Sequence, residues 1–244
     1  MLTHTDYNPP KEPYLDIVHE DSSIIVVNKP SGILSVPGKE EHLFDCVLTR
    51  RQKNYPFAAA AHRLDMSTSG IMVVPKTRTA AGELGKQFQA RTVHKCYYAW
   101  IDGRMERESG TVDLPIALDI NNKPLQRIDF ENGRRAVTDF LRLYADNDRS
   151  FVRLMPVTGR SHQLRLHMKE LGHPILGDKW YGQPHATPKA PHLYLHAGEL
   201  SFNHPSTGER LCFCVLPPFA VPDNFKFWME EKLPSQPSED NAST

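Results

Sequence analysis

Residues 62–70 of the chain read His-Arg-Leu-Asp-Met-Ser-Thr-Ser-Gly, which places the carboxylate of Asp65 near the guanidinium of Arg63 in a turn-rich break. Two apolar runs, residues 57–61 and 71–74, flank this break. Short apolar runs bounded by turn residues are typical of buried strands, so we expect two strands to hold a rigid loop that suits catalysis. Asp and Ser also hydrogen-bond their own backbone in tight turns, so Asp65 could serve only to shape the loop.

Outside this loop, the hydrophobic pattern alternates between strand and helix periods. The predicted strands cover residues 23–28 and 32–36, several segments between 95 and 151, and residues 193–202 and 211–215; the predicted helices cover residues 44–54, 77–90 and 161–171. This order predicts an α+β protein with a mixed, largely antiparallel β-sheet core flanked by helices and loops. In the last helix, Leu164, Met168 and Leu171 form the predicted buried stripe, and Arg165 lies beside it.

The length of 244 residues and the hydrophobic content of 39% are sufficient for one substantial core, with or without a minor lobe. We expect an N-terminal extension (residues 1–21), a central domain (22–222) and a C-terminal segment (223–244) in which a helix precedes a disordered tail. No apolar run approaches the roughly 18 residues of a membrane span, and the N-terminal extension lacks the features of a secretion signal. We therefore expect a cytoplasmic protein without membrane contacts.

Charge is unevenly distributed along the chain. The 29 basic and 29 acidic residues cancel overall, but residues 22–222 hold 26 basic and 19 acidic residues, a net charge of plus seven. Phosphate contacts depend on local charge, so the central domain is compatible with nucleic-acid binding. The same excess is also common on solvated surfaces, so charge alone does not establish such a partner.

Several common catalytic and metal-binding motifs are absent from the sequence. Residues 32–39 lack the glycine spacing and the Ser or Thr of a phosphate-binding loop, and neither GxSxG nor HExxH occurs. The four cysteines and twelve histidines are not grouped at ligand spacing, so we expect no metal site and no cofactor. His62, His162 and His167 are interpreted as hydrogen-bonded structural residues or backbone anchors rather than metal ligands.

The nonapeptide at residues 62–70 resembles the HRLDxxTSG signature of the RluA family of pseudouridine synthases at every fixed position. Further blocks resemble the family in the same order: KCYYA at residues 95–99, GRSHQLRLH at 159–167, HPILGD at 173–178 and LHA at 195–197. The resemblance extends over about residues 14–220. It implies the pseudouridine synthase fold, with the central domain as the catalytic domain.

The activity implied by the resemblance is isomerisation of uridine in RNA, in which the glycosidic N1 bond breaks, the uracil turns over and its C5 bonds to the sugar. A carboxylate must attack C1′ or remove a proton from C2′, and the family motif assigns this role to Asp65. By the same resemblance, Arg165 keeps that carboxylate ionised. Tyr97 matches a ring that stacks on the uracil and assists removal of the C5 proton; it could also be a core residue, although Tyr98, on the alternate face of the strand, suits that role better.

A uridine within a folded stem or loop must leave the base stack to reach the catalytic carboxylate, at a cost of a few kcal/mol. Arg63 could fill the vacated space, or it could contact a phosphate or a carboxylate. The motifs that resemble the family also contain His62, Arg160, His162 and Gln163, which we expect to contact RNA.

By resemblance, the expected partners are a tRNA anticodon stem-loop and a hairpin of 23S ribosomal RNA, bound by a monomer. One basic face can grip a compact hairpin while its loop bases are splayed and read. Two alternatives remain open: a non-catalytic module that reads the shape of RNA hairpins, and a synthase of the same family with a different rRNA or tRNA uridine as target. A carboxylate-based hydrolase is disfavoured, because it needs two cooperating carboxyl groups and no second one lies near the motif.

Overall fold

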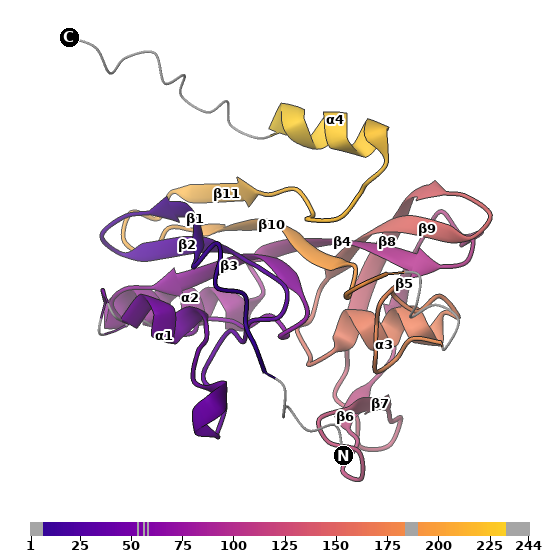
Figure 1. Cartoon of the computed structure of the whole chain (residues 1–244), viewed down its shortest axis with the longest axis horizontal. Helices are drawn as coiled ribbons and strands as arrows, with labels where there is room; N and C mark the ends of the chain where they lie inside the picture. The colour runs from indigo at the N-terminus through magenta and orange to yellow at the C-terminus, as the bar shows by residue number, and fades with distance from the viewer. Residues whose placement is uncertain (1–6, 53, 56, 58, 184–189, 233–244) are drawn as a thin grey trace.

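The computed structural model describes residues 7–52, 54–55, 57, 59–183 and 190–232, and its centre is a nine-stranded β-sheet (Figure 1). In spatial order the strands are β1 (Asp16–Glu20), β2 (Ile24–Lys29), β3 (Ser69–Pro75), β10 (Leu195–Asn203), β4 (His94–Asp102), β9 (Arg149–Pro156), β8 (Val137–Ala145) and β5 (Ser109–Asp113), and β11 (Arg210–Cys214) also pairs with β10. Strands β3 and β10 are parallel, and the other neighbours in this sheet are antiparallel. The predicted α+β fold with a mixed, largely antiparallel sheet is confirmed.

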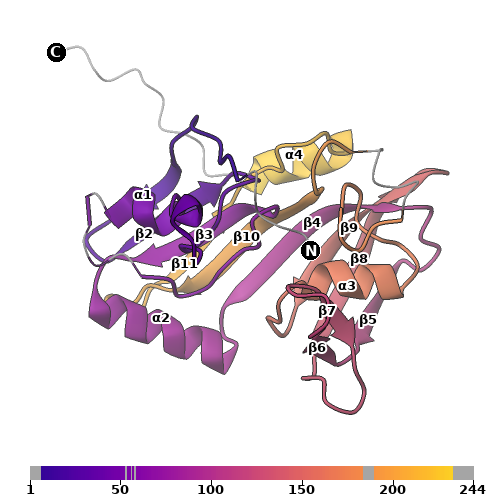
Figure 2. The ribbon, with the colours of Figure 1, turned by 60° about the horizontal axis from the view of Figure 1, so that its bottom comes forward.

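Helices and a small hairpin flank the sheet. The helices of the described residues are α1 (Val47–Gln52), α2 (Arg78–Ala90), α3 (Gln163–Glu170) and α4 (Asp223–Lys232), with a 3-10 helix η1 (Glu41–Leu43). The hairpin consists of β6 (Ile116–Leu118) and β7 (Gln126–Ile128) and lies next to α3 (Figure 2). None of the helices within the described ranges is long and apolar enough to cross a membrane.

Alternation along β4 divides the core between the two faces of the sheet. Tyr98 and Trp100 pack on one face with Phe151 and with residues of α4. Ala99 and Ile101 pack on the other face with residues of α3, and Tyr97 lies against this second cluster. Because successive side chains of a strand point to opposite faces, this arrangement places Tyr97 and α3 on the same side of the sheet.

One residue from each of three neighbouring strands, β3, β10 and β4, lies in a single row across the middle of the sheet. Gly70 of β3 lies opposite Ala197 of β10, and Ala197 in turn lies opposite Tyr97 of β4. Gly70 has φ of 116°, and a Cβ atom there would lie 2.3 Å from the carbonyl oxygen of Ala197. Glycine is therefore required at residue 70, both for its backbone conformation and for the close approach of β10.

Several predicted elements differ from those of the structure. Of the strand predicted over residues 57–61, the described residues 57 and 59–61 are not in a strand, because both edges of β3 are already occupied by β2 and β10. Residues 32–36 do not form one either; an isolated bridge joins Leu34 to Cys46. The helix predicted over residues 44–54 begins only at Val47, because the Thr49 hydroxyl in its first turn accepts the Cys46 amide and donates to the Phe44 carbonyl.

The other predicted elements agree with the structure. The helix predicted over residues 77–90 is α2, and the side chain of Thr77 caps it by accepting the Ala80 amide. The proposed domain boundaries stay predictions, but part of the N-terminal extension forms the edge strand β1, and α4 begins the C-terminal segment. The tail predicted over residues 233–244 lies outside the described residues.

Candidate active site

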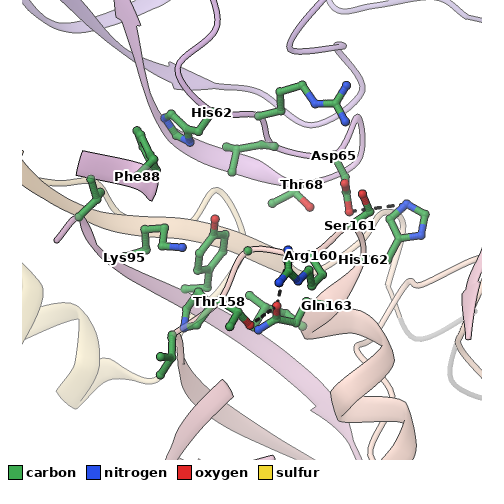
Figure 3. A pocket seen from close by; sticks show the side chains of 18 of the residues that line it. His62, Asp65, Thr68, Phe88, Lys95, Thr158, Arg160, Ser161, His162 and Gln163 are labelled. Atoms are coloured by element: carbon green, nitrogen blue, oxygen red, sulfur yellow. Dashed lines mark hydrogen bonds and ion pairs between the residues drawn. The ribbon is translucent and has the colours of Figure 1, made fainter. Parts of the chain in front are cut away.

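A cavity of about 530 Å³ lies between the 62–70 loop, the end of α2, the start of β4 and the loop that leads from β9 into α3 (Figure 3). All the residues predicted for the site line this cavity: Asp65, Tyr97, Arg165, Arg63, His62, Arg160, His162 and Gln163. The structure thus brings together three sequence blocks that are far apart along the chain.

The 62–70 loop is anchored to the segment that follows β2. The Ser35 hydroxyl donates to the Leu64 carbonyl at 2.7 Å and accepts the Leu64 amide at 3.1 Å. The Gly32 amide donates to the Met66 carbonyl at 2.9 Å. The segment that was predicted to be a strand therefore uses its hydrogen-bonding groups to hold the loop.

The side chain of Lys29 adds a further anchor. It is fully buried, and its ammonium group donates to the carbonyls of Pro30, Ile33 and Met66 at 3.0, 2.9 and 3.1 Å. Burial lowers the pKa of Lys29 to about 7, and the negative charge of Asp65 acts in the opposite direction. Lys29 thus joins the turn after β2 to the residue that follows Asp65.

The carboxylate of Asp65 points out of its own loop and into the cavity (Figure 3). The turn is closed by the backbone, since the Thr68 amide donates to the Asp65 carbonyl at 3.1 Å. The Asp65 Oδ2 atom lies 3.6 Å from Nη1 of Arg165 and 3.9 Å from Nε2 of His162, and the side chain is 31% exposed. This orientation argues against a carboxylate that serves only to shape the turn.

Arg165 is held by a second carboxylate, that of Asp178. Its Nε and Nη2 atoms donate to the two Asp178 oxygens at 2.7 Å each, a bidentate geometry. The Asp178 carboxylate also accepts the amides of Trp180 and Tyr181. Arg165 lies beside the stripe of Leu164 and Met168, as predicted, but it is only 3% exposed and therefore not a solvated charge. Helical periodicity assigns a charged residue to solvent, and it cannot show a buried partner supplied by a distant loop.

Both members of the buried pair, Arg165 and Asp178, are charged. Burial opposes the charge of Arg165, but the bonds to Asp178 outweigh it and raise the pKa of the guanidinium. Burial would raise the pKa of Asp178, but Arg165 and the two backbone amides leave it below its usual value. The guanidinium also lies over the rings of Trp180 and Tyr181, at 4.8 and 5.1 Å from their centres. Arg165 is therefore fixed in position next to Asp65.

His162 adopts a left-handed backbone conformation at the start of α3, with φ of 54°. Its Nδ1 atom is 2.7 Å from the Tyr181 hydroxyl, which accepts the Gln126 amide. Burial lowers the pKa of His162, so the ring is neutral near pH 7. Because the Tyr181 hydroxyl can donate to Nδ1, the Nε2 proton of His162 can point toward Asp65.

Tyr97 lies half-buried in the wall of the cavity. Burial, together with the negative charge of Asp65, raises the pKa of its phenol, so the hydroxyl is neutral at physiological pH. Tyr98, on the other face of β4, is fully buried and its hydroxyl donates to Glu199. The interpretation of Tyr98 as the core tyrosine is confirmed.

Gln163 uses all its hydrogen-bonding groups within the protein. Its Oε1 atom accepts from the Thr158 hydroxyl at 2.7 Å and from the Arg160 amide at 3.0 Å. Its Nε2 atom donates to the Val137 carbonyl at 2.9 Å and to the Thr138 hydroxyl at 3.0 Å. A carboxamide has two donor and two acceptor positions, so this geometry leaves none for the RNA contact predicted from the sequence. Gln163 instead fixes the loop before α3.

The histidines that were interpreted as structural are hydrogen-bonded as expected. The Nε2 atom of His62 accepts the Val73 amide at 3.0 Å, and its ring stacks on Phe88. Burial, with a contribution from the charge of a nearby lysine, lowers the pKa of His62 to about 3. The ring of His167 is buried and bonds to the Thr138 hydroxyl at 2.9 Å. Within the described residues, no cluster of three or more His, Cys, Asp or Glu side chains could hold a metal ion.

Residues 23–170 match the family model described as RNA pseudouridylate synthase, which covers more than half of the chain. The chain belongs to the RNA pseudouridylate synthase family. As a member of this family, it is an enzyme that isomerises uridine to pseudouridine in RNA. The functional class expected from the resemblance in sequence is confirmed.

Similar synthases are known from several bacteria. The chain is 51% identical over 209 residues to the dual-specificity RNA pseudouridine synthase RluA of Haemophilus influenzae, covering 85% of this chain and 95% of that relative. It is 49% identical over 209 residues to the protein of the same name from Escherichia coli (strain K12), with the same coverage. These alignments include every block that carries the cavity.

Two solved structures have the same fold as this synthase. Human RNA Pseudouridylate Synthase Domain Containing 1 matches with a TM-score of 0.73 at 27% identity, covering 94% of this chain and 99% of that one. Human RNA Pseudouridylate Synthase Domain Containing 4 matches with a TM-score of 0.67 at 26% identity, covering 83% and 88%. The pseudouridine synthase fold predicted from the sequence is therefore confirmed.

Sequence reasoning missed three residues of the synthase cavity and its supports. Asp178 and Lys29 hold Arg165 and the 62–70 loop, and Lys95 lines the cavity itself. Asp178 belongs to the HPILGD block and Lys95 to the KCYYA block, so both had a sequence signal that was not given a role. Lys29 follows an apolar strand and precedes a Pro-Ser-Gly turn, a position where a buried lysine is unusual.

Proposed function

We propose that this synthase acts on uridines in both a tRNA anticodon stem-loop and a hairpin of 23S ribosomal RNA, as a monomer in the cytoplasm. The observation that carries the choice of two substrates is the identity of about half the aligned residues to relatives named as dual-specificity enzymes. A cavity of about 530 Å³ is within the size range of sites that enclose a small ligand, so it can receive one flipped nucleotide. One chain supplies this cavity, which supports a monomer.

Asp65 is the proposed catalytic residue. Its carboxylate faces the cavity and has cationic and neutral donors beside it, so it is available either to attack C1′ or to remove the C2′ proton of the target uridine. In both routes the N1–C1′ bond breaks, the uracil rotates, and a C5–C1′ bond forms. The C5 proton then leaves and N1 gains a proton, so the product is an isomer of the substrate.

Arg165 is proposed to keep Asp65 charged and correctly placed. It lies 3.6 Å from the Asp65 carboxylate, while Asp178 holds the guanidinium from the other side. A buried arginine with two carboxylate neighbours cannot swing away to meet RNA phosphate. His162 supports the same carboxylate from the start of α3.

Tyr97 is proposed to stack on the uracil while it rotates and to assist removal of the C5 proton. Its ring faces the cavity, and its neutral phenol can take part in hydrogen bonds without adding a charge next to Asp65. Around it, exposed Arg63 and half-buried Arg160 are proposed to contact RNA, with Arg63 either entering the vacated stack or binding a phosphate. His62 is proposed to line the path of the flipped base.

The experiment compares initial rates on four RNAs at fixed salt: an anticodon stem-loop, a 23S hairpin, and a scrambled-loop version of each. We expect both natural hairpins to be converted and the scrambled ones to be poor substrates, because splayed loop bases are read directly. Salt must be constant, since phosphate contacts make affinity depend on it. Equal rates on all four RNAs would refute loop-specific reading. Conversion of one natural hairpin alone would refute dual specificity, and conversion of neither would point to a different uridine target.

A further inference from the structure

The charged residues of the cavity are mostly cations. Besides Asp65, they are Arg63, Arg91, Lys95, Arg160 and Arg165. The Asp65 carboxylate is already next to Arg165, which is itself paired with Asp178. The remaining cations of this wall therefore lack a carboxylate among the residues that line the cavity.

Lys95 is the cation next to the stacking position on the same strand. It precedes Tyr97 by two residues in β4, so the two side chains point to the same face of the sheet, about 7 Å apart along the strand. Figure 3 shows the Lys95 ammonium pointing into the cavity. Lys95 is half-buried, and neither an ion pair nor a hydrogen bond fixes its ammonium in the part of the chain that the structure describes.

The surroundings of Lys95 favour an incoming anion. Burial and the like charge of Arg91 both lower the pKa of Lys95, which means that its charge is poorly compensated in the free protein. Gly159 brings bare backbone to the same place, since a Cβ atom there would lie 3.7 Å from the Lys95 Nζ atom. No side chain of residue 159 therefore blocks access to the ammonium.

Arg91 contributes a second, independent observation. It ends α2 in the left-handed conformation, with φ of 60°, a position at which helices commonly place glycine. A residue other than Gly or Asn is strained in this conformation. The side chain of Arg91 lines the cavity next to Lys95. The left-handed end of α2 therefore places a second cation beside the Lys95 ammonium.

We propose that Lys95 and Arg91 form a phosphate subsite that binds the RNA backbone at the target uridine. This inference rests on the proposed function and specifies where the flipped nucleotide is held. The base stacks on Tyr97, and the phosphate on its 5′ side reaches Lys95. Binding of the phosphate supplies the compensating charge that Lys95 lacks in the free protein, and it fixes the sugar over Asp65.

The test measures the affinity of RNA hairpins in the Asp65→Asn background, where turnover does not interfere, as a function of potassium chloride concentration. Lys95→Met keeps the apolar stem and removes the charge. We expect it to weaken binding several-fold and to reduce the slope of log affinity against log salt by about 0.7, the value for one lost contact with a single strand. Lys95→Arg should restore most of the slope. The matched control is Lys86→Met, an exposed lysine of α2 outside the cavity, which should change neither quantity.

A second arm locates the phosphate. One hairpin carries a neutral methylphosphonate on the 5′ side of the target uridine, with a 2′-O-methyl group on the preceding nucleotide in both this RNA and its unmodified partner. Chains with Lys95 should lose affinity for the neutral linkage, and Lys95→Met should show a smaller further loss, because only Arg91 then remains to contact the phosphate. Melting temperatures of all variants are measured in parallel to establish that each one is folded.

An unchanged salt slope for folded Lys95→Met, or the same methylphosphonate penalty with and without Lys95, would overturn the subsite. Insensitivity to the methylphosphonate combined with competition by inorganic phosphate beyond that of chloride at equal ionic strength would identify free phosphate as the ligand, and it would overturn the assignment to RNA. These binding results do not depend on turnover. Failure of the unsubstituted enzyme to convert either hairpin would therefore refute the proposed targets without affecting the test of the subsite.

Discussion

Arg165 and Asp178 are joined by two hydrogen bonds of 2.7 Å, and both side chains are almost completely removed from solvent. The third nitrogen of the same guanidinium faces Asp65 at 3.6 Å. One arginine thus connects a carboxylate of the protein interior with a carboxylate of the cavity, and variants of these residues should affect stability and turnover to different extents.

Arg165→Met should reduce turnover more than RNA affinity, because its partners are carboxylates rather than phosphate. It should also destabilise the fold by about 3–5 kcal/mol, since it leaves Asp178 buried without a counter-charge. Arg165→Met combined with Asp178→Asn should recover much of the stability but not the turnover. Chemical denaturation and single-turnover assays measure the two effects. A double variant as unstable as the single one, or a defect mainly in binding, would contradict this account.

Asp65→Asn should abolish pseudouridine formation while the fold and RNA binding are retained. The substitution removes the reacting charge and changes the side-chain volume very little. Product is measured by digestion and mass analysis of nucleosides after labelling of pseudouridine, and affinity by titration. Asp148→Asn, at an exposed aspartate outside the cavity, is the control and should be fully active. Appreciable turnover by Asp65→Asn would exclude both proposed routes.

Tyr97→Phe and Tyr98→Phe form a matched pair on opposite faces of β4. Tyr97→Phe keeps the stacking ring and loses the hydroxyl, so turnover should fall at least tenfold with little change in RNA affinity. Tyr98→Phe leaves Glu199 without its phenol donor and should lower the free energy of unfolding by about 1–3 kcal/mol, with turnover per folded molecule unchanged. The reverse pattern would show that the two tyrosines have been assigned to the wrong roles.

Lys29 should make stability depend on pH. Its pKa is about 7 in the folded protein and 10.5 in an ordinary exposed lysine, so between these values the unfolded chain holds a proton that the folded chain has lost. Unfolding then takes up a proton, and the folded state gains stability as pH rises from 7 toward 10, by at most about 1.4 kcal/mol per pH unit. Below pH 7 both states are protonated, and the contribution of Lys29 stays constant.

The measurement compares urea unfolding of the natural chain and Lys29→Met from pH 6 to pH 10. The difference in unfolding free energy should move in favour of the natural chain above about pH 7, because other titrating groups are common to both proteins. A difference that is flat across this range would show that Lys29 keeps its proton when buried.

Exhaustive chelation with EDTA should leave activity intact when the RNA is refolded under matched conditions. The reaction as proposed uses only protein side chains, and magnesium affects it only through the fold of the RNA. The check is turnover of a hairpin whose melting curve is the same with and without the chelator. Loss of activity that one metal ion specifically restores would require a metal in the mechanism.

The sequence predicted which residues meet in the cavity, but it did not predict the buried contacts that hold them in place. The blocks that contain Asp65, Tyr97 and Arg165 could be placed by resemblance, and β4 could be read from its alternation. The burial of Arg165 could not, because its partner Asp178 comes from a loop after α3 and helical periodicity carries no information about it. For the same reason, Gln163 was given an RNA contact although the protein itself uses its whole amide.

Gly70, Ala197 and Tyr97 are paired across β3, β10 and β4, and this pairing sets the relative position of the two strands that lead to the catalytic groups. The loop with Asp65 enters β3 just before this row, and Tyr97 lies on β4. The backbones that carry the two groups are therefore held apart by the two inter-strand spacings around β10, about 10 Å in total. An enzyme that accepts larger or modified bases can therefore be engineered by substitutions outside the cavity. Substitutions along β10 that shift its register against β3 or β4 would change the relative position of carboxylate and ring without replacing either one.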